Sequence, residues 1–473
     1  MGNESGNSNL KNYIDQLKVE IKNKEELPNV VDAIIKTATE KFCSIEKIED
    51  SYYIKKGNNP LVLLHLNIDS LSKVYFDIFD VDDEESIVSK SNINIITSAI
   101  LINYLLMYSD ESFDVLITKN NIQDKTSDYS LIRRYLRCDN IINLNLRQDD
   151  CLADEFSSLI LSVIKVPIKR FRPSYGFISY RLSISKLIGG KSGENINKLR
   201  LNSIKLIMSI LRKMKAKVDL EMVAISAGDR YDNIPSYADI DFIINSDYEN
   251  ELENIFDIIK NEVIEKNLRY EPDMQIECQK IDDKNIDPIT TESFNHLASL
   301  IELLPSGTFA VNSIDNQTIS SSNLATTKSL RHSINIILVL RSLTEESMNQ
   351  MLEKTILATK ISGSKFNEKL LIPRWKNSNH ELRDCFKESY NELFDQSLEV
   401  VKTQYSLDSS MIFDKVNVNI VSLGVKYKQD DECFHSRIND IEKIIDLIGK
   451  VLSNMRKSKE NVWLRYWIFM VMK

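Results

Sequence analysis

The feature that most constrains the fold is the stretch from Tyr175 to Leu206, in which a strand pattern changes to a helix pattern at a glycine turn. Apolar residues alternate up to Ile184, and this period of two predicts a strand. Glycines then stand at positions 189, 190 and 193, in a chain with only 12 glycines among 473 residues. Glycine adopts backbone conformations that other residues avoid, so we expect a specific turn that tolerates no Cβ atom. Apolar residues at helical spacing follow the turn.

Strand and helix patterns alternate along the rest of the chain. Before the glycine turn, helices are expected at 10–21, 30–42 and 93–107, and strands at 51–55, 61–69, 113–118 and 140–146. After the turn begins, the expected strands are 178–186, 219–225, 240–245 and 333–343, and the expected helices 196–213, 249–266 and 344–361. The last part has helices at 379–395 and 437–455 and strands at 399–404 and 416–423. This alternation predicts an α/β fold with a mixed, largely parallel sheet flanked by helices and an inserted α/β domain.

Composition and charge exclude several classes of protein. Hydrophobic residues make up 42% and charged residues 27% of the chain, which is typical of a globular domain protein. The net charge of −9 argues against a nucleic-acid partner. The six cysteines have no C-x-x-C spacing, and the polar N-terminus lacks a signal peptide's apolar core, so we expect reduced thiols and a cytoplasmic location.

The last residues, 462–473, form an apolar tail that is too short to be a transmembrane segment, which needs about 20 apolar residues. Docking of the tail against the core is the simpler interpretation. The alternative is a tail that binds a partner or touches a membrane. Its candidate contact residues are Trp463, Tyr466, Trp467 and Phe469.

The turn Gly189-Gly-Lys-Ser-Gly193 resembles the segment in which aminoacyl-histidine dipeptidases, members of a large zinc exopeptidase family, pass from the catalytic domain into a lid domain. The family has histidine where this chain has Lys191. Four further stretches are similar, in the family's order and spacing: 219–236, 320–325, 340–342 and 372–377. The resemblance implies a zinc-exopeptidase-like fold, with a catalytic-type domain over 1–176 and 370–461, an inserted lid domain over 177–369 and the tail over 462–473.

In that family, imidazole and carboxylate groups at strand ends hold two zinc ions, and the resemblance identifies the matching positions here. They are Asn67 for a ligand histidine, Asp69 for its orienting aspartate, Ser91 for the bridging aspartate, Asn121 and Ile122 for a glutamate pair, and Asn145 for a further carboxylate. Amides and hydroxyls cannot hold two dications together at neutral pH. We therefore expect no catalytic residues at these positions, nor at Lys191, and no metal cofactor.

A rearranged metal site is the alternative, built from His65, Asp69 and His435, with Asp149, Asp150 and Asp154 as conceivable stand-ins. His435 matches the family's final ligand histidine. His65 shares a strand face with Asn67 but stands about 6–7 Å away, so a histidine held by packing or a hydrogen bond is the favoured interpretation.

These observations predict a catalytically inactive, dipeptidase-like protein, a pseudoenzyme rather than an enzyme, that works as a binding, scaffold or complex-assembly component. An active dipeptidase with zinc in a rearranged site is the alternative. We also expect a protein partner or self-association. The resemblance implies a homodimer through the lid, because family members pair there.

Overall fold

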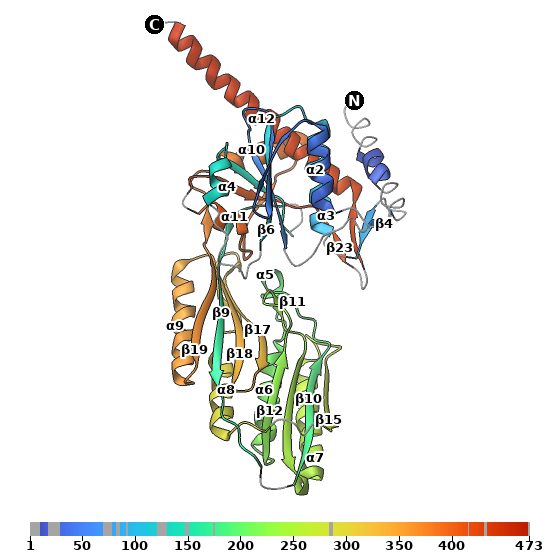
Figure 1. Cartoon of the computed structure of the whole chain (residues 1–473), viewed down its shortest axis with the longest axis vertical. Helices are drawn as coiled ribbons and strands as arrows, with labels where there is room; N and C mark the ends of the chain where they lie inside the picture. Colours follow the sequence, from blue (N-terminus) through green and yellow to red (C-terminus); the bar gives the residue numbers. More distant parts are fainter. Residues whose placement is uncertain are drawn as a thin grey trace. The chain divides into compact units, whose positions relative to one another are not determined.

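The computed structural model describes residues 10–17, 29–69, 78–81, 86–90, 93–120, 130–146, 151–173, 176–282, 287–414, 416–429 and 433–471. The chain forms two compact units (Figure 1). The first unit comprises residues 1–155, 375–402 and 407–473, and the second comprises 156–374 and 403–406.

The first unit is built on a mixed sheet whose parallel strands lie in the middle. In order across the sheet, the strands are β1 (Ser44–Ile48), β2 (Ser51–Lys56), β6 (Phe113–Asn120), β3 (Leu63–Asp69), β7 (Asn140–Asn143), β22 (Asn419–Ser422), β8 (Cys151–Phe156) and β20 (Trp375–Lys376), with β21 (Glu399–Thr403) also paired to β8. The strands β6, β3, β7 and β22 pair in parallel. Leu63, Leu64 and Leu66 of β3 are fully buried, as expected for a central strand covered on both faces.

Helices of the first unit pack in series beside this sheet. They are α2 (Val30–Glu40), α3 (Ile93–Tyr108), α12 (Ile438–Val471) and α10 (Glu381–Phe394), while the short helices α4 (Ser130–Tyr135) and α11 (Asp408–Ile412) pack on each other. Residues 10–17 are also helical. The helix α3 is buried nearly all round, because its residues are almost uniformly apolar. A small sheet has the order β23 (Lys428–Gln429), β24 (Phe434–Arg437), β5 (Ser86–Ser89) and β4 (Ile78–Val81).

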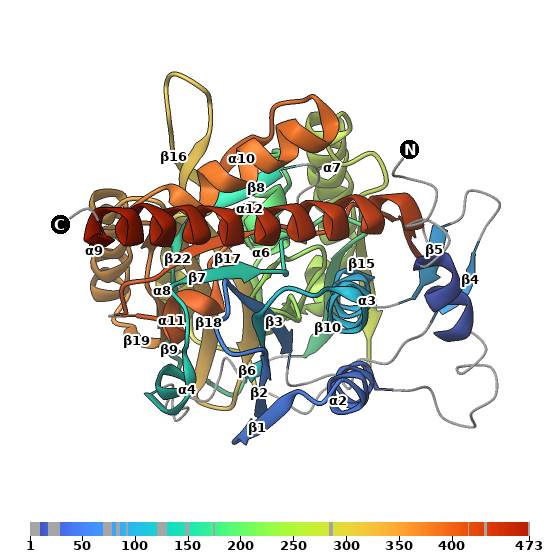
Figure 2. The same ribbon diagram turned by 90° about the horizontal axis from the view of Figure 1, so that it is seen from above.

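The final helix is longer than predicted. The pattern predicts a helix over 437–455, whereas α12 continues to Val471 as one long helix (Figure 2). The backbone of 462–471 is therefore part of α12 rather than a separate tail. The side chains of Trp463, Tyr466, Trp467 and Phe469 lie outside the described part of the structure. In the part of the chain that is described, no helix combines the length and apolar character needed to cross a membrane.

The second unit has an antiparallel sheet covered by helices. Its strands, in order, are β15 (Gln275–Ile281), β10 (Phe177–Ser185), β14 (Ala238–Asn245), β12 (Leu220–Ala227), β17 (Thr318–Ser329), β18 (Ser333–Ser342), β9 (Ser158–Pro167) and β19 (Lys365–Ile372), with β16 (Gly307–Val311) also paired to β17. The helices α7 (Glu249–Asn267), α6 (Ser203–Lys215), α8 (Thr291–Leu303) and α9 (Glu345–Ile361) pack in that order (Figure 1). Shorter elements are β11 (Gly190–Lys191), α5 (Ser192–Asn195), β13 (Asn233–Ile234) and the 3₁₀ helix Ser246–Tyr248.

Besides the end of α12, one unit boundary and one helix boundary differ from the sequence prediction. Residues 156–176 pack with the second unit rather than with the first, because β9 pairs along its length with β18 and β19. The helix expected at 196–213 begins only at Ser203. Its N-cap is Asn202, whose side chain accepts hydrogen bonds from the backbone N–H groups of Ile204 and Lys205.

The glycine turn needs glycine at two of its three positions. Gly189 and Gly190 have φ angles of 57° and 113°, in the region that residues with a Cβ rarely adopt. Gly193 has no positive φ, and a Cβ there would make an ordinary contact, 3.5 Å from the Tyr405 ring. The expectation that no Cβ is tolerated is therefore correct for Gly189 and Gly190 and wrong for Gly193.

Candidate functional site

The ends of the central parallel strands in the first unit carry a connected group of neutral polar side chains. His65 and Asn67 come from β3, Thr118 from β6, Asn143 from the end of β7, and Asn145 follows β7 directly. The parallel register places Asn67 beside Thr118 and His65 beside Asn143. Since parallel strands end at the same edge of a sheet, residues far apart in sequence meet there.

Asn145 binds the backbone of Asn67 through both atoms of its amide. Its Oδ1 accepts a hydrogen bond from the Asn67 N–H at 2.8 Å, and its Nδ2 donates to the Asn67 carbonyl at 2.8 Å. The Asn67 side chain accepts a hydrogen bond from the Thr118 hydroxyl at 2.9 Å. Asn143 is bound in turn, because its Oδ1 accepts from the Ser422 hydroxyl at 2.7 Å. The family's ligand positions 67 and 145 are thus joined by amide hydrogen bonds.

His65 is fully buried at the centre of this group. Its Nε2 lies 2.9 Å from Thr118 Oγ1, and its Nδ1 lies 2.6 Å from Ser409 Oγ on α11. Because the Thr118 hydroxyl already donates to Asn67, its oxygen accepts from an Nε2–H group, and Nδ1 then accepts from Ser409. Burial lowers the pKa of His65 to about 3. The imidazole is therefore neutral at physiological pH, with a hydrogen-bond partner at each nitrogen.

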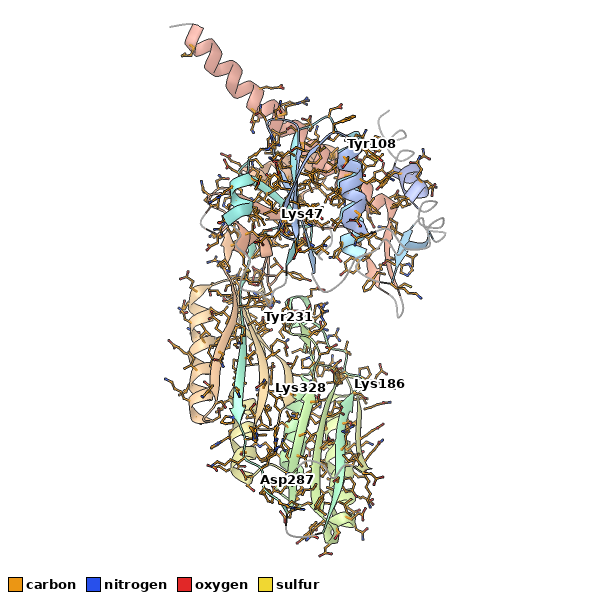
Figure 3. All side chains as sticks on the ribbon, viewed as in Figure 1. Lys47, Tyr108, Lys186, Tyr231, Asp287 and Lys328 are labelled. Atoms are coloured by element: carbon orange, nitrogen blue, oxygen red, sulfur yellow. The ribbon has the colours of Figure 1, made fainter. Side chains whose placement is uncertain are left out.

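Lys191, at the family's lid-histidine position, is part of an ion-paired group in the second unit. Its Nζ lies 2.7 Å from Asp232 Oδ2, and Arg230 donates to Asp232 Oδ1 at 2.9 Å. Burial alone would raise the pKa of Asp232, but the bonds from Arg230 and Lys191 outweigh burial and lower the pKa to about 2. Asn323 supports the same loop by donating to the carbonyls of Asn233 and Tyr231, the latter labelled in Figure 3.

The remaining predicted positions lie apart from this group or outside the description. Ser91, Asn121, Ile122, Asp149 and Asp150 are outside the described residues, as is the side chain of Asp69, whose backbone pairs in β3 with Asn120 of β6. His435 is half-buried in β24, opposite Val88 of β5. Asp154 is buried in β8, where burial raises its pKa, and Arg383 lies 3.5 Å away.

The described residues do not fit a two-zinc site. Zinc needs imidazole nitrogens and carboxylate oxygens that are free to coordinate. Positions 67 and 145 carry amides, and both nitrogens of His65 are hydrogen-bonded to hydroxyls. Within the described ranges, no cluster of three or more histidine, cysteine, aspartate or glutamate side chains could hold a metal ion. No step of a reaction is therefore assigned to a metal at these residues.

The fold itself defines a class of protein. A mixed α/β unit, interrupted in sequence by a second α/β unit with an antiparallel sheet, is the arrangement that the resemblance to two-domain exopeptidases implies. No protein-family model matches the chain. In sequence, the chain is 21% identical over 320 residues to the cytosol non-specific dipeptidase of Escherichia coli (strain K12); the match covers 66% of this chain and spans only 64% of the length of that relative.

Two solved structures share the fold over most of their length. Aminoacylhistidine dipeptidase from Vibrio alginolyticus has a TM-score of 0.66 at 17% identity, with 89% of this chain and 91% of that chain covered. A tripeptidase from Staphylococcus aureus has a TM-score of 0.53 at 10% identity, with 90% and 91% covered. The predicted α/β fold and the resemblance to the aminoacyl-histidine dipeptidase family are therefore confirmed, and the chain has a dipeptidase-like fold.

The prediction that the chain is not an enzyme is wrong. The missing ligands at positions 67, 91, 121 and 145 led to the expectation that the chain is not an enzyme. The proteins that it resembles in sequence and in fold are dipeptidases, which are enzymes, and no finding supports inactivity. Nor does any finding support the expectation that it uses no cofactor. Loss of individual ligand types at matched positions is not sufficient evidence against an activity.

Sequence reasoning missed several members of the strand-end group, namely Thr118, Asn143, Ser409 and Ser422. Asn143 and Thr118 carried a usable signal, because each is a polar residue after an apolar run, two residues before Asn145 and three residues before Asn121, respectively. Ser409 and Ser422 carried none, since Ser409 is 344 positions from its partner His65.

Proposed function

We propose that the chain acts on short peptides as a dipeptidase-like enzyme in the cytoplasm. The observation that carries this proposal is the sequence similarity to a cytosol non-specific dipeptidase, together with a fold shared with an aminoacylhistidine dipeptidase over 89% of the chain. The class of substrate comes from those relatives. By their names, both relatives act on dipeptides.

Zinc is the cofactor that we propose to test first, because the resembled family is a zinc exopeptidase family. A bound zinc ion would polarise a peptide carbonyl and activate water. In this chain the described residues at the strand ends supply hydrogen bonds instead: Asn67, Thr118 and Asn145 hold the ends of β3, β6 and the segment after β7 together. Their contribution is to fix the sheet edge, and we assign them no ligand role.

The test is an assay of the purified full-length chain against a panel of dipeptides and tripeptides. Release of free amino acids is measured with no added metal, with zinc, with manganese and with a chelator, and the metal content of the protein is measured alongside. A mock purification from cells lacking the chain controls for host peptidases. We expect release above the mock level. Absence of release under every condition, from protein that melts cooperatively, would refute the proposal.

A binding or complex-assembly role is the second candidate, favoured by the neutral side chains at the described ligand positions 67 and 145. Trp463, Tyr466, Trp467 and Phe469 are its candidate contact residues, on the last turns of α12. Deleting residues 462–473 should remove a co-purifying protein without lowering the melting temperature. A partner retained by the truncated chain would contradict a role for these residues.

Self-association through the second unit is a related proposal. β19 lies at one end of the described sheet order, and strands at a sheet edge present backbone groups for pairing. Leu371 of β19 and Leu357 and Ile361 of α9 are 50%, 58% and 59% exposed. A second copy of the chain would cover them. Sedimentation should give a dimer for the native chain and a monomer for a Leu357→Glu, Ile361→Glu variant; a native monomer at micromolar concentration would exclude this.

A further inference from the structure

The segment Thr403–Ser406 packs with the second unit although the residues on both sides of it, Lys402 and Leu407, belong to the first. Within the second unit it contacts four parts of the chain: Ser157 beside β9, the start of β17, the end of β18, and residues 193–194 at the glycine turn. These contacts resemble those of a bound peptide, because they are made largely to its backbone and to one side-chain amide.

Ser157 holds the backbone of the segment. Its N–H lies 3.1 Å from the carbonyl oxygens of both Thr403 and Tyr405 and is shared between them. Its hydroxyl donates to the Gln404 carbonyl at 2.6 Å, and its Oγ lies 3.2 Å from Ser406 Oγ. Ser157 is fully buried, so these bonds are shielded from water.

Gln404 is held at both ends of its amide. Its Nε2 donates to the carbonyls of Thr318 and Ile319 at 2.9 and 3.0 Å, and its Oε1 accepts from the Ser321 hydroxyl at 3.1 Å. The side chain is nearly buried, with the residue 8% exposed. Both the donor and the acceptor of this buried amide are therefore paired, as buried polar groups in proteins usually are.

A buried arginine and a glutamate also bind the segment Thr403–Ser406. Arg341, which is 7% exposed, donates through Nη1 to the Gln404 carbonyl at 3.3 Å and to Ser406 Oγ at 3.2 Å. The Tyr405 hydroxyl donates to Glu194, in α5. The Tyr405 ring also lies against Gly193. The segment is thus bound to the glycine turn at residues 189–193 and to the short helix α5 that overlaps it.

We propose that Thr403–Ser406 is an internal peptide that occupies a peptide-binding recess of the second unit formed by Ser157, Glu194, Ser321 and Arg341, and that a short peptide of the same chemistry competes with it. The Tyr405 contact with Glu194, between two half-buried side chains, is the point at which it is released. Release exposes hydrogen-bond donors of Ser157, Ser321 and Arg341, which can bind a peptide backbone and a side-chain amide. This inference does not depend on hydrolysis, and it goes beyond the activity proposed above.

The first test is hydrogen exchange in the full chain. Tyr405→Phe removes the hydroxyl that binds Glu194, and exchange at the Ser157 and Tyr405 amides should become about tenfold faster, the effect of losing one hydrogen bond to a charged acceptor. Tyr180→Phe is the matched control, because Tyr180 donates to Glu249 at 2.9 Å elsewhere in the second unit. Unchanged exchange at both amides in Tyr405→Phe, or equal acceleration there in the control, would overturn the proposal.

The second test supplies the peptide in trans. A labelled acetyl-Thr-Gln-Tyr-Ser-amide is titrated into the native chain and into a Gln404→Ala, Tyr405→Ala variant, whose folding is checked by thermal melting. We expect saturable binding to the variant at least about tenfold tighter than to the native chain, and loss of binding when Arg341→Met is added. Equal binding to both proteins, or none to a cooperatively melting variant, would refute competition. Neither result depends on whether dipeptides are hydrolysed.

Discussion

Asn145 pairs with the backbone of Asn67 as a neighbouring strand would, accepting from its N–H and donating to its carbonyl, each at 2.8 Å. The pair connects the end of β3 with the segment after β7. Both positions match ligand positions of the resembled family, and here they hold each other. This relationship makes the strand ends a structural joint built from neutral groups.

Replacing Asn145 by aspartate tests that joint. Asn145→Asp keeps the acceptor for the Asn67 N–H, but it removes the donor and sets a carboxylate against the Asn67 carbonyl. We expect a loss of about 1–3 kcal/mol in the free energy of unfolding, measured by denaturant titration. The control is Asn417→Asp, since among the described residues the exposed Asn417 accepts from Ser378 at 3.2 Å and donates to none. Equal stability of Asn145→Asp and the native chain would show that the hydrogen bonds between Asn145 and Asn67 do not stabilise the fold.

His65 makes stability depend on pH. Its pKa is about 3 in the folded chain, below its ordinary value of 6.5, so only the unfolded chain takes up a proton between these values. His65 should therefore not reduce the free energy of unfolding above pH 6.5. Below pH 6.5 the free energy of unfolding should fall, by at most about 1.4 kcal/mol per pH unit.

Removing the imidazole should flatten this dependence. Urea titrations from pH 7 to pH 4 should give a smaller slope for His65→Gln than for the native chain. The matched variant Thr118→Val removes a partner of His65 at 2.9 Å but keeps the imidazole, so it should be less stable at every pH with the slope retained. The same slope in His65→Gln and the native chain would show that His65 is not the titrating group.

Asn103 of α3 is a polar residue in an apolar core. It is fully buried, and neither its Oδ1 nor its Nδ2 has a hydrogen-bond partner among the described residues. A buried unpaired amide costs about 1–3 kcal/mol. Asn103→Leu should therefore raise the melting temperature, whereas leucine at the exposed Asn250 of α7 should change stability by less than about 0.5 kcal/mol. A lower melting temperature for Asn103→Leu would indicate that the amide is satisfied.

Alanine substitutions at Gly190 and Gly193 should have different effects on stability. Gly190 has a φ of 113°, and a Cβ there would lie 3.0 Å from Asn195 Nδ2, so Gly190→Ala should cost about 1–3 kcal/mol. Gly193→Ala should be close to neutral, because its Cβ would make only ordinary contacts. Thermal melting of the two variants compares them directly, and equal losses would place the constraint elsewhere in the turn.

Local patterns predicted the central elements well. The apolar run that became β3 and the uniformly apolar α3 were found because each has a length and periodicity that only one element type fits. Thr344 was expected to begin a helix, and its side chain indeed caps α9 by accepting from the Ser347 N–H. β9 was not predicted, although its burial alternates and Ile164 and Val166 point into the core.

Long-range pairing explains what the sequence did not reveal. Asn67 and Asn145 were identified through a resemblance, but their mutual hydrogen bonds join residues 78 positions apart. The place of Thr403–Ser406 in the second unit depends on side chains as distant as Ser157. The prediction of inactivity was wrong for a related reason: the residues at matched positions describe only one arrangement of a site.

The most direct test of the proposed function is the release of amino acids from dipeptides by the purified chain, with and without zinc, compared with the mock purification. If the chain is a dipeptidase, release should scale with the concentration of the chain and be absent from the mock sample. No release at any chain concentration, with zinc, manganese or no added metal, from protein that is folded by thermal melting, would contradict the proposed function.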